Sequence, residues 1–168
     1  GVDITQPLTQ PQVAALEAGM DRYAVLVYHG QRFADDDQQK RFSRYFGALE
    51  TTAGGNVTRP EQRRLDADMA DVSNLGADHQ PLARDDRRRL FNLGNQLWHS
   101  GSSFRAVPAK YSLLSGRIVV DKGGNTEFAD MRAAYDALDD ETKAQIEHLV
   151  CEHSRLYSRG RLGFTELS

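Results

Sequence analysis

The segment from Trp98 to Phe104, which reads Trp-His-Ser-Gly-Ser-Ser-Phe, constrains this chain more than any other feature. Side chains two residues apart on an extended chain point the same way, so His99 and position 101 are expected to share one face of a strand. In the common oxygen-activating iron site, two histidines and one carboxylate bind one side of the metal. The first histidine and the carboxylate usually have this His-x-Asp spacing, but Gly101 has no side chain that could bind a metal. The segment is therefore either no metal site, or a metal site with one more open position.

The composition is that of an ordinary globular domain. The 168 residues are 39% hydrophobic and 27% charged, which is enough for one domain with a real core. A net charge of −3 gives no electrostatic case for nucleic acid or an anionic membrane. No run approaches the roughly 20 apolar residues that span a bilayer. The one cysteine, Cys151, excludes an intrachain disulfide and predicts a cytoplasmic location.

Local patterns predict helices joined to short strands. Capping residues and apolar spacing predict four helices. The first starts near Thr9, and the second spans residues 35–46. The third starts after Asp130, and the fourth starts after Asp139 or Asp140 and carries Ile146, Leu149 and Val150. Apolar, β-prone runs predict strands at residues 24–28, 71–74, 111–120 and 126–128. Residues 51–64 lack periodicity and predict a long, functional loop. Strands with helical insertions favour an α+β domain on a mainly antiparallel sheet or barrel.

Three longer segments of the chain resemble a known family of enzymes. They are residues 95–104 (Asn-Gln-Leu-Trp-His-Ser-Gly-Ser-Ser-Phe), 108–112 (Pro-Ala-Lys-Tyr-Ser) and 123–138, which opens Gly-Gly-Asn-Thr-Glu-Phe. These segments closely resemble the iron(II)/2-oxoglutarate-dependent dioxygenases of the taurine and 2,4-dichlorophenoxyacetate dioxygenase type. The resemblance implies a double-stranded β-helix (jelly-roll, cupin-like) core with flanking helices, and Fe(II), 2-oxoglutarate and O₂ as cofactors. It also implies that residues 1–168 are the N-terminal portion of a single catalytic domain, because the second iron-binding histidine and an arginine for 2-oxoglutarate come from a C-terminal portion.

The resemblance also implies roles for individual residues. His99 takes the place of the first iron-binding histidine, and Thr126 that of a hydroxyl that contacts a carboxylate of 2-oxoglutarate. Without the family resemblance, a histidine such as His99 is more often a core or hydrogen-bonded residue than a metal ligand. Thr126 would likewise be an ordinary strand threonine. Asn95 stands where some members touch substrate with an amide, and a turn-forming asparagine is an equal alternative. His148 and His153 are expected to be ordinary surface or helix-end histidines.

Gly101 departs from the family pattern, because hydroxylases have Asp or Glu at this position. Its presence opens a coordination position and removes one negative charge beside Fe²⁺, and a halide could supply both. The arrangement resembles that of 2-oxoglutarate-dependent halogenases, so we predict radical chlorination of an unactivated C–H bond in place of hydroxylation, with chloride as cosubstrate. The alternatives are a hydroxylase impaired by loss of its carboxylate ligand and a non-catalytic protein that binds a small carboxylate. The glycine is either natural or an introduced change.

The family favours small substrates with an anionic group, which predicts a basic residue in the pocket. The candidates, in order, are Arg105, then Arg59, Arg63 and Arg64, each with a solvent-exposed alternative. Phenoxyacetate-type members carry a basic residue in the loop after the Phe-Gly-x-Leu-Glu segment, and residues 51–56 contain none. This favours an N-acyl amino acid or similar aliphatic acid over an aryloxy acid. We expect a small-molecule carboxylate as substrate, no nucleic acid or membrane partner, and a homo-oligomer.

Overall fold

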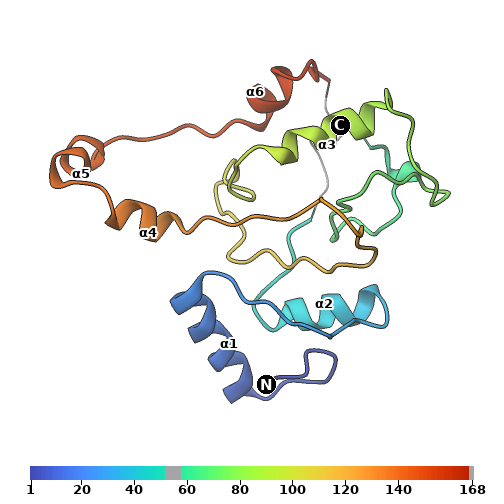
Figure 1. The fold of residues 1–168 in the computed structure, drawn as a ribbon, viewed down its shortest axis with the longest axis horizontal. Coiled ribbons are helices and arrows are strands. Elements are labelled where there is room, and N and C mark those ends of the chain that lie inside the picture. Colours follow the sequence, from blue (N-terminus) through green and yellow to red (C-terminus); the bar gives the residue numbers. More distant parts are fainter. Residues whose placement is uncertain (52–57, 167–168) are drawn as a thin grey trace. The chain divides into compact units, whose positions relative to one another are not determined.

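The computed structural model, which describes residues 1–51 and 58–166, contains short helices joined by extended and irregular segments (Figure 1). Its contacts fall into two units, each made of segments that lie far apart in the sequence. Unit 1 comprises Gly1–Ala48 and Leu113–Cys151, and unit 2 comprises Leu49–Ser112 and Glu152–Ser168. Among the described residues, no helix has both the length and the apolar character needed to cross a membrane.

The first two helices of unit 1 begin where the capping residues predict. α1 (Gln10–Tyr23) starts after Thr9, whose backbone N–H donates to the Gln12 side chain at 2.8 Å in a capping box. α2 (Asp36–Arg44) starts after Asp35, whose carboxylate accepts from the Gln38 N–H at 2.7 Å. Both helix predictions are confirmed.

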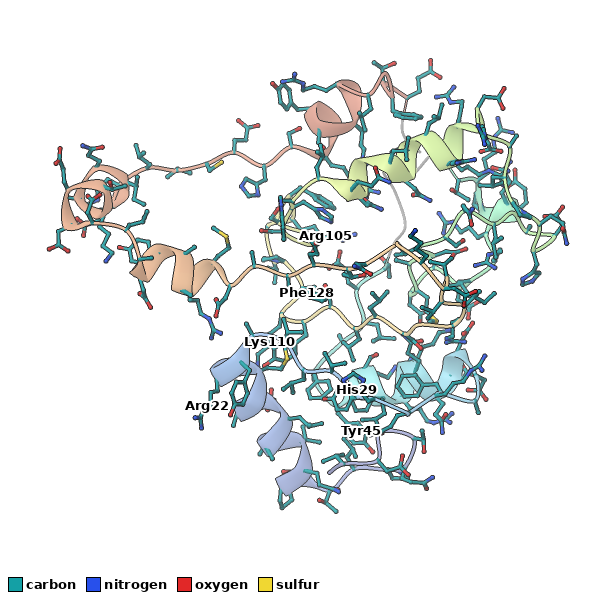
Figure 2. The ribbon with its side chains drawn as sticks, viewed as in Figure 1. Arg22, His29, Tyr45, Arg105, Lys110 and Phe128 are labelled. Carbon is teal, nitrogen blue, oxygen red and sulfur yellow. The ribbon has the colours of Figure 1, made fainter. Side chains whose placement is uncertain are left out.

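The buried cluster of unit 1 lies around Phe42. Its buried members are Ile4, Leu16, Phe33 and Phe42, and partly buried Val2, Leu8, Leu26, Tyr28 and Phe46 pack against them. The Phe42 ring meets Tyr28 at 5.9 Å and Phe46 at 5.5 Å between centroids, both edge to face. Tyr45, labelled in Figure 2, ties the N-terminal segment to α2, because its hydroxyl accepts from the Leu8 N–H at 2.9 Å.

Two further helices of unit 1 are capped by aspartates, as predicted. α4 (Met131–Asp136) starts after Asp130, which accepts from the Arg132 N–H at 2.9 Å. α5 (Asp140–Ile146) starts after Asp139, which accepts from the Thr142 N–H at 2.7 Å. The predicted extension of α5 through residues 149 and 150 is wrong. Val150 is 96% exposed, and a short helix whose apolar side packs on nothing gains too little to continue.

The predicted strands at residues 24–28, 71–74, 111–120 and 126–128 are not strands in the structure. In the described part of the chain, β pairing is limited to an isolated antiparallel bridge between Leu75 and Pro81. A strand exists only when a partner satisfies its backbone groups, and the β-prone run 111–120 remains without one, with Ile118 82% exposed. The jelly-roll core that the family resemblance implies is therefore not formed by these segments.

Unit 2 contains η1 (Pro60–Gln62), α3 (Arg87–Leu93), η2 (Gly94–Gln96) and α6 (Arg155–Gly160). Asp86 caps α3 by accepting from the Arg88 N–H at 2.8 Å, and Ser154 caps α6. Phe91 of α3 is buried and meets the Phe164 ring edge to face at 5.3 Å. Of the predicted loop 51–64, residues 52–57 lie outside the described residues, and η1 lies within the remainder.

Candidate functional site

A cavity of about 590 Å³ lies within unit 2. Its wall is formed largely by residues 62–75, by α3 and η2, by residues 99–105, and by α6. Six of the residues predicted for the site line this one cavity: Arg63, Arg64, Asn95, His99, Gly101 and Arg105. Unit 2 therefore brings most of the candidate site together.

The ring of His99 is held by a contact with the backbone two residues before it. Its Nδ1 lies 2.7 Å from the carbonyl oxygen of Leu97, and a carbonyl can only accept, so Nδ1 carries the hydrogen. The lone pair of the neutral ring is then on Nε2. A metal-binding histidine almost always donates its other ring N–H to a carbonyl or carboxylate in this way. The exposed His99 ring thus fits one ligand position of a metal site.

The chain turns directly after His99 and does not continue as the extended strand we predicted. The Arg105 N–H donates to the Ser102 carbonyl at 3.0 Å, and Ser102 adopts a left-handed φ of 49°. The Ser102 hydroxyl accepts from the Ala109 N–H at 2.9 Å and closes the loop. A non-glycine residue in this region costs free energy that surrounding contacts must offset, and such residues cluster at functional sites.

Gly101 does not need to be glycine on conformational grounds. Its φ lies outside the left-handed region that favours glycine. A Cβ added at this position would meet Ser112 Oγ at 3.3 Å, and that is the one atom found within 4 Å of it among the described residues. A short side chain therefore fits after a shift of a few tenths of an ångström at Ser112.

The described residues offer part of an iron site. The imidazole of His99 suits Fe(II), but Gly101 contributes no ligand. Within residues 1–51 and 58–166, no group of three or more His, Cys, Asp and Glu side chains gathers in a way that could hold a metal. His153, expected to be an ordinary surface histidine, is exposed and also lines the cavity.

Arg105, labelled in Figure 2, and Asn95 both have defined partners. Arg105 Nε lies 2.6 Å from Glu50 Oε1, and its Nη2 donates to the Thr51 carbonyl at 2.8 Å. The side-chain Oδ1 of Asn95 accepts from Arg159 Nη2 at 2.9 Å. These contacts fix both side chains at the cavity wall, and their predicted roles toward substrate remain predictions.

Arg64, another candidate for substrate binding, forms a bidentate pair with Asp71. Its Nε lies 2.7 Å from Asp71 Oδ2, and its Nη2 lies 2.8 Å from Oδ1 and 3.2 Å from Ser73 Oγ. Burial alone would raise the pKa of Asp71, but hydrogen bonds from Arg64 and Ser73, with the charges of Arg64 and His79, lower it overall. Arg63 also lines the cavity, whereas Arg59 is exposed at the start of η1.

Sequence reasoning missed two arginines that reach the cavity from α6. Arg159 donates to the Phe91 carbonyl at 2.8 Å, and its guanidinium lies 4.3 Å from the Phe91 ring centroid. The Arg155 guanidinium lies 5.3 Å from the ring centroid of Phe104 and 6.0 Å from that of Phe91. Both arginines are more than 50 residues from Phe104 in the sequence, so spacing carried no signal for them.

Thr126 lies in unit 1, exposed in the extended segment before α4. It is the predicted site residue that does not belong to unit 2. Its role toward 2-oxoglutarate remains a prediction.

Comparisons with known proteins give one consistent result. The family described as "Taurine catabolism dioxygenase TauD, TfdA family" matches residues 1–167. The chain is 44% identical, over 99% of its length, to an alpha-ketoglutarate-dependent 2,4-dichlorophenoxyacetate dioxygenase from Cupriavidus pinatubonensis, of which the match covers 58%. It is 37% identical, over 91% of its length, to an (S)-phenoxypropionate/alpha-ketoglutarate-dioxygenase from Delftia acidovorans, of which the match covers 49%.

A solved structure gives the same result for the fold. The crystal structure of AAD-2 in complex with Mn(II) and N-oxalylglycine is similar to this chain, with a TM-score of 0.91 and 61% sequence identity. The match covers 99% of this chain and 57% of that one. The chain thus has the fold of half of a family member, although its own described residues form no continuous strand. It spans about half the length of the relatives it matches.

Proposed function

Because the chain belongs to the TauD/TfdA dioxygenase family, we propose that the protein is an iron(II)- and 2-oxoglutarate-dependent enzyme that oxidises an unactivated C–H bond of a small carboxylate. The observation that carries this proposal is His99, whose Nδ1 is fixed by the Leu97 carbonyl and whose ring lines the cavity of unit 2. We include in the proposal that the remaining iron ligands lie outside the described residues. Similarity to enzymes whose names include alpha-ketoglutarate supports the cosubstrate.

In the proposed reaction, the residues of this chain bind and orient the iron, the 2-oxoglutarate and the substrate. His99 would hold the iron through Nε2, and Thr126 would donate a hydrogen bond to a carboxylate of 2-oxoglutarate. Asn95 and Arg105 line the cavity where substrate lies. The iron and 2-oxoglutarate, when bound, supply the activation of O₂ and the oxidation of the C–H bond.

A finer proposal concerns Gly101, whose lack of a side chain leaves one iron position for an external ligand. We propose that, with iron bound, this position would take up chloride, and that the substrate would then be chlorinated in place of being hydroxylated. The support is that the backbone conformation does not require glycine at position 101. The lack of a carboxylate there is therefore not explained by folding, and we assign it to the chemistry of the site. The names of the relatives favour the other outcome, a hydroxylase that Gly101 impairs.

For the substrate, we propose an aryloxyalkanoic acid. The similarity to 2,4-dichlorophenoxyacetate and (S)-phenoxypropionate dioxygenases supports this class. Phe91 and Phe104 add aromatic surface to an arginine-rich cavity, which suits an aromatic acid. The N-acyl amino acid predicted from the lack of basic residues at 51–56 is the second candidate. We keep the cytoplasmic location and the homo-oligomer as parts of the proposal, the first supported by the single cysteine.

The test combines full-length protein with Fe(II), 2-oxoglutarate, O₂ and 2,4-dichlorophenoxyacetate, with and without chloride, and measures succinate and product mass. Substrate-dependent succinate supports the dioxygenase proposal. With this acid, either product releases the phenol and glyoxylate, so the chloride dependence decides: a chlorinated product, or phenol release that requires added chloride, supports the finer proposal, and phenol release or uncoupled succinate that ignores chloride contradicts it. The absence of succinate, with this acid and with N-acyl amino acids, contradicts the enzyme proposal and favours a carboxylate-binding protein. His99→Gln serves as the inactive control.

A further inference from the structure

The cavity wall of unit 2 carries an excess of positive charge. Its carboxylates belong to Glu50 and Asp71. Its guanidinium groups belong to Arg63, Arg64, Arg88, Arg105, Arg155 and Arg159. A recess with this excess of one sign, between walls of low dielectric constant, attracts and concentrates anions. Which arginine can bind a ligand directly depends on the groups that each one already contacts.

Both carboxylates of the wall already have an arginine as a partner. Arg64 forms a two-pronged pair with Asp71, in which Nε lies 2.7 Å from Oδ2 and Nη2 lies 2.8 Å from Oδ1. Arg105 Nε lies 2.6 Å from Glu50 Oε1, and its Nη2 donates to the Thr51 carbonyl at 2.8 Å. An anionic ligand would have to break an existing ion pair to bind either guanidinium in the same way.

Three more arginines of the wall are engaged by other groups. Arg88 pairs at 2.7 Å with Asp86, the residue that caps α3. Arg159 donates to the Phe91 carbonyl at 2.8 Å, and its guanidinium lies 4.3 Å from the Phe91 ring centroid. The Arg155 guanidinium lies 6.0 Å from the same centroid and takes part in a further interaction. Each of these three side chains thus has contacts within the protein.

Arg63 differs from the other arginines of the wall. Its side chain is half-buried and lines the cavity. Within residues 1–51 and 58–166, its guanidinium forms no hydrogen bond, ion pair or ring contact. A guanidinium carries five N–H donors, and none of those of Arg63 is taken by this part of the chain. The positive charge of Arg63 is therefore available to an anion that enters the cavity.

The backbone on both sides of Arg63 is fixed. Its own N–H donates to the Pro60 carbonyl at 3.2 Å, which closes η1. The next residue, Arg64, is held by its pair with Asp71. Binding of an anion therefore orders one side chain without ordering a loop, and this keeps the entropic cost of binding low.

We propose that Arg63 binds the carboxylate of the substrate and makes the cavity select acids over their neutral analogues. The guanidinium matches a carboxylate in a two-pronged hydrogen bond. This inference rests on the proposed function for the identity of the acid. It also separates the basic residues that the sequence offered together, because Arg64 and Arg105 are engaged by carboxylates and Arg59 lies outside the wall.

The test is an anaerobic calorimetric titration of full-length protein, loaded with Fe(II) and 2-oxoglutarate. The ligands are 2,4-dichlorophenoxyacetate and its neutral amide, 2,4-dichlorophenoxyacetamide. Loss of a charge-assisted hydrogen-bond pair predicts that Arg63→Gln weakens binding of the acid about 10- to 100-fold and leaves binding of the amide within about 2-fold. Arg63→Lys keeps the charge but loses the two-pronged geometry, so it is expected to retain part of the preference.

Arg59→Gln is the matched control. Arg59 stands at the start of η1, exposed and outside the cavity wall, so this variant loses the same charge close by in the sequence. It is expected to bind both ligands as wild type does. Arg63→Gln and Arg59→Gln should both unfold at the temperature of wild type, because the Arg63 guanidinium has no contact to lose within the described residues.

Three results would overturn the assignment. One is a wild type that binds the acid no better than the amide, and another is an Arg63→Gln variant that binds the acid as tightly as wild type. The third is an equal loss of acid and amide in Arg63→Gln, which marks a role in folding alone.

The visible charge-transfer band of Fe(II) with 2-oxoglutarate, recorded on the same samples before substrate is added, separates this test from that of the proposed function. An intact band, together with an acid preference that survives in Arg63→Gln, refutes the role of Arg63 alone. A missing band in wild type refutes the proposed function, while an acid preference that is lost in Arg63→Gln still supports Arg63.

Discussion

Replacing Gly101 by aspartate returns the carboxylate that the family pattern contains, so it is expected to strengthen Fe(II) binding. A partner that only orients a metal ligand contributes about 10- to 100-fold to affinity, and a direct ligand contributes at least as much. We therefore expect Gly101→Asp to bind Fe(II) at least about 10- to 100-fold more tightly, or about 1.4–2.8 kcal/mol. The fold should tolerate the change, because φ is not left-handed and the added Cβ meets Ser112 Oγ at 3.3 Å. A stability change within about 1 kcal/mol is expected, since a side chain at a compatible glycine position also restricts the unfolded chain.

The assay is an anaerobic Fe(II) titration against a competing chelator, with thermal unfolding of each variant measured in parallel. Gly101→Ala is the matched control, because it has the same Cβ contact with Ser112 but no carboxylate. The variants should unfold within a few degrees of each other, and only the aspartate variant should gain affinity. On the proposal that the wild type chlorinates its substrate, turnover of Gly101→Asp should give the hydroxylated product instead. Equal Fe(II) affinity in the aspartate and alanine variants would refute the reasoning that position 101 faces the metal.

Three other predictions concern the rest of the chain. Asp71→Asn should lower the free energy of unfolding, measured in urea, by about 1–3 kcal/mol. This range lies between the values for exposed and for buried ion pairs. Equal stability of the variant and the wild type would contradict this prediction. Because the pKa of Asp71 is lowered on folding, its contribution is fully present above about pH 4 and is lost as the pH falls through the folded value, so the variant should show a weaker loss of stability in acid. Phe42→Ala should lower the free energy of unfolding by about 3–5 kcal/mol, because Phe42 is only 4% exposed. A loss below about 1 kcal/mol would show that the cluster around Phe42 does not stabilise unit 1. Thr126→Val should raise the 2-oxoglutarate concentration for half-maximal rate about 10-fold or more, and an unchanged requirement would remove Thr126 from the site.

Local chemistry explains which helices could be predicted. An aspartate or threonine that caps a helix acts within three residues, so Thr9, Asp35, Asp130 and Asp139 mark helix starts in the sequence itself. The same signal is present at Asp86, next to the arginines of α3. It was missed because seven residues with one buried side chain show no clear apolar periodicity.

Strands and distant contacts could not be predicted in the same way. The apolar run at residues 111–120 has the composition of a strand, but a strand needs a partner, and composition does not tell where the partner lies. For the site, the motif around His99 and Gly101 is local and was found. Arg155 and Arg159 reach the same cavity from a separate segment, and only the folded unit brings them there.

An anaerobic chloride titration tests the proposal that Gly101 leaves a position for a halide. Full-length protein is loaded with Fe(II) and 2-oxoglutarate, and the visible charge-transfer band is followed as chloride is added. We expect a saturable shift of the band in wild type and in Gly101→Ala, and none in Gly101→Asp. A band that forms but ignores chloride in wild type would contradict the claim and leave an impaired hydroxylase.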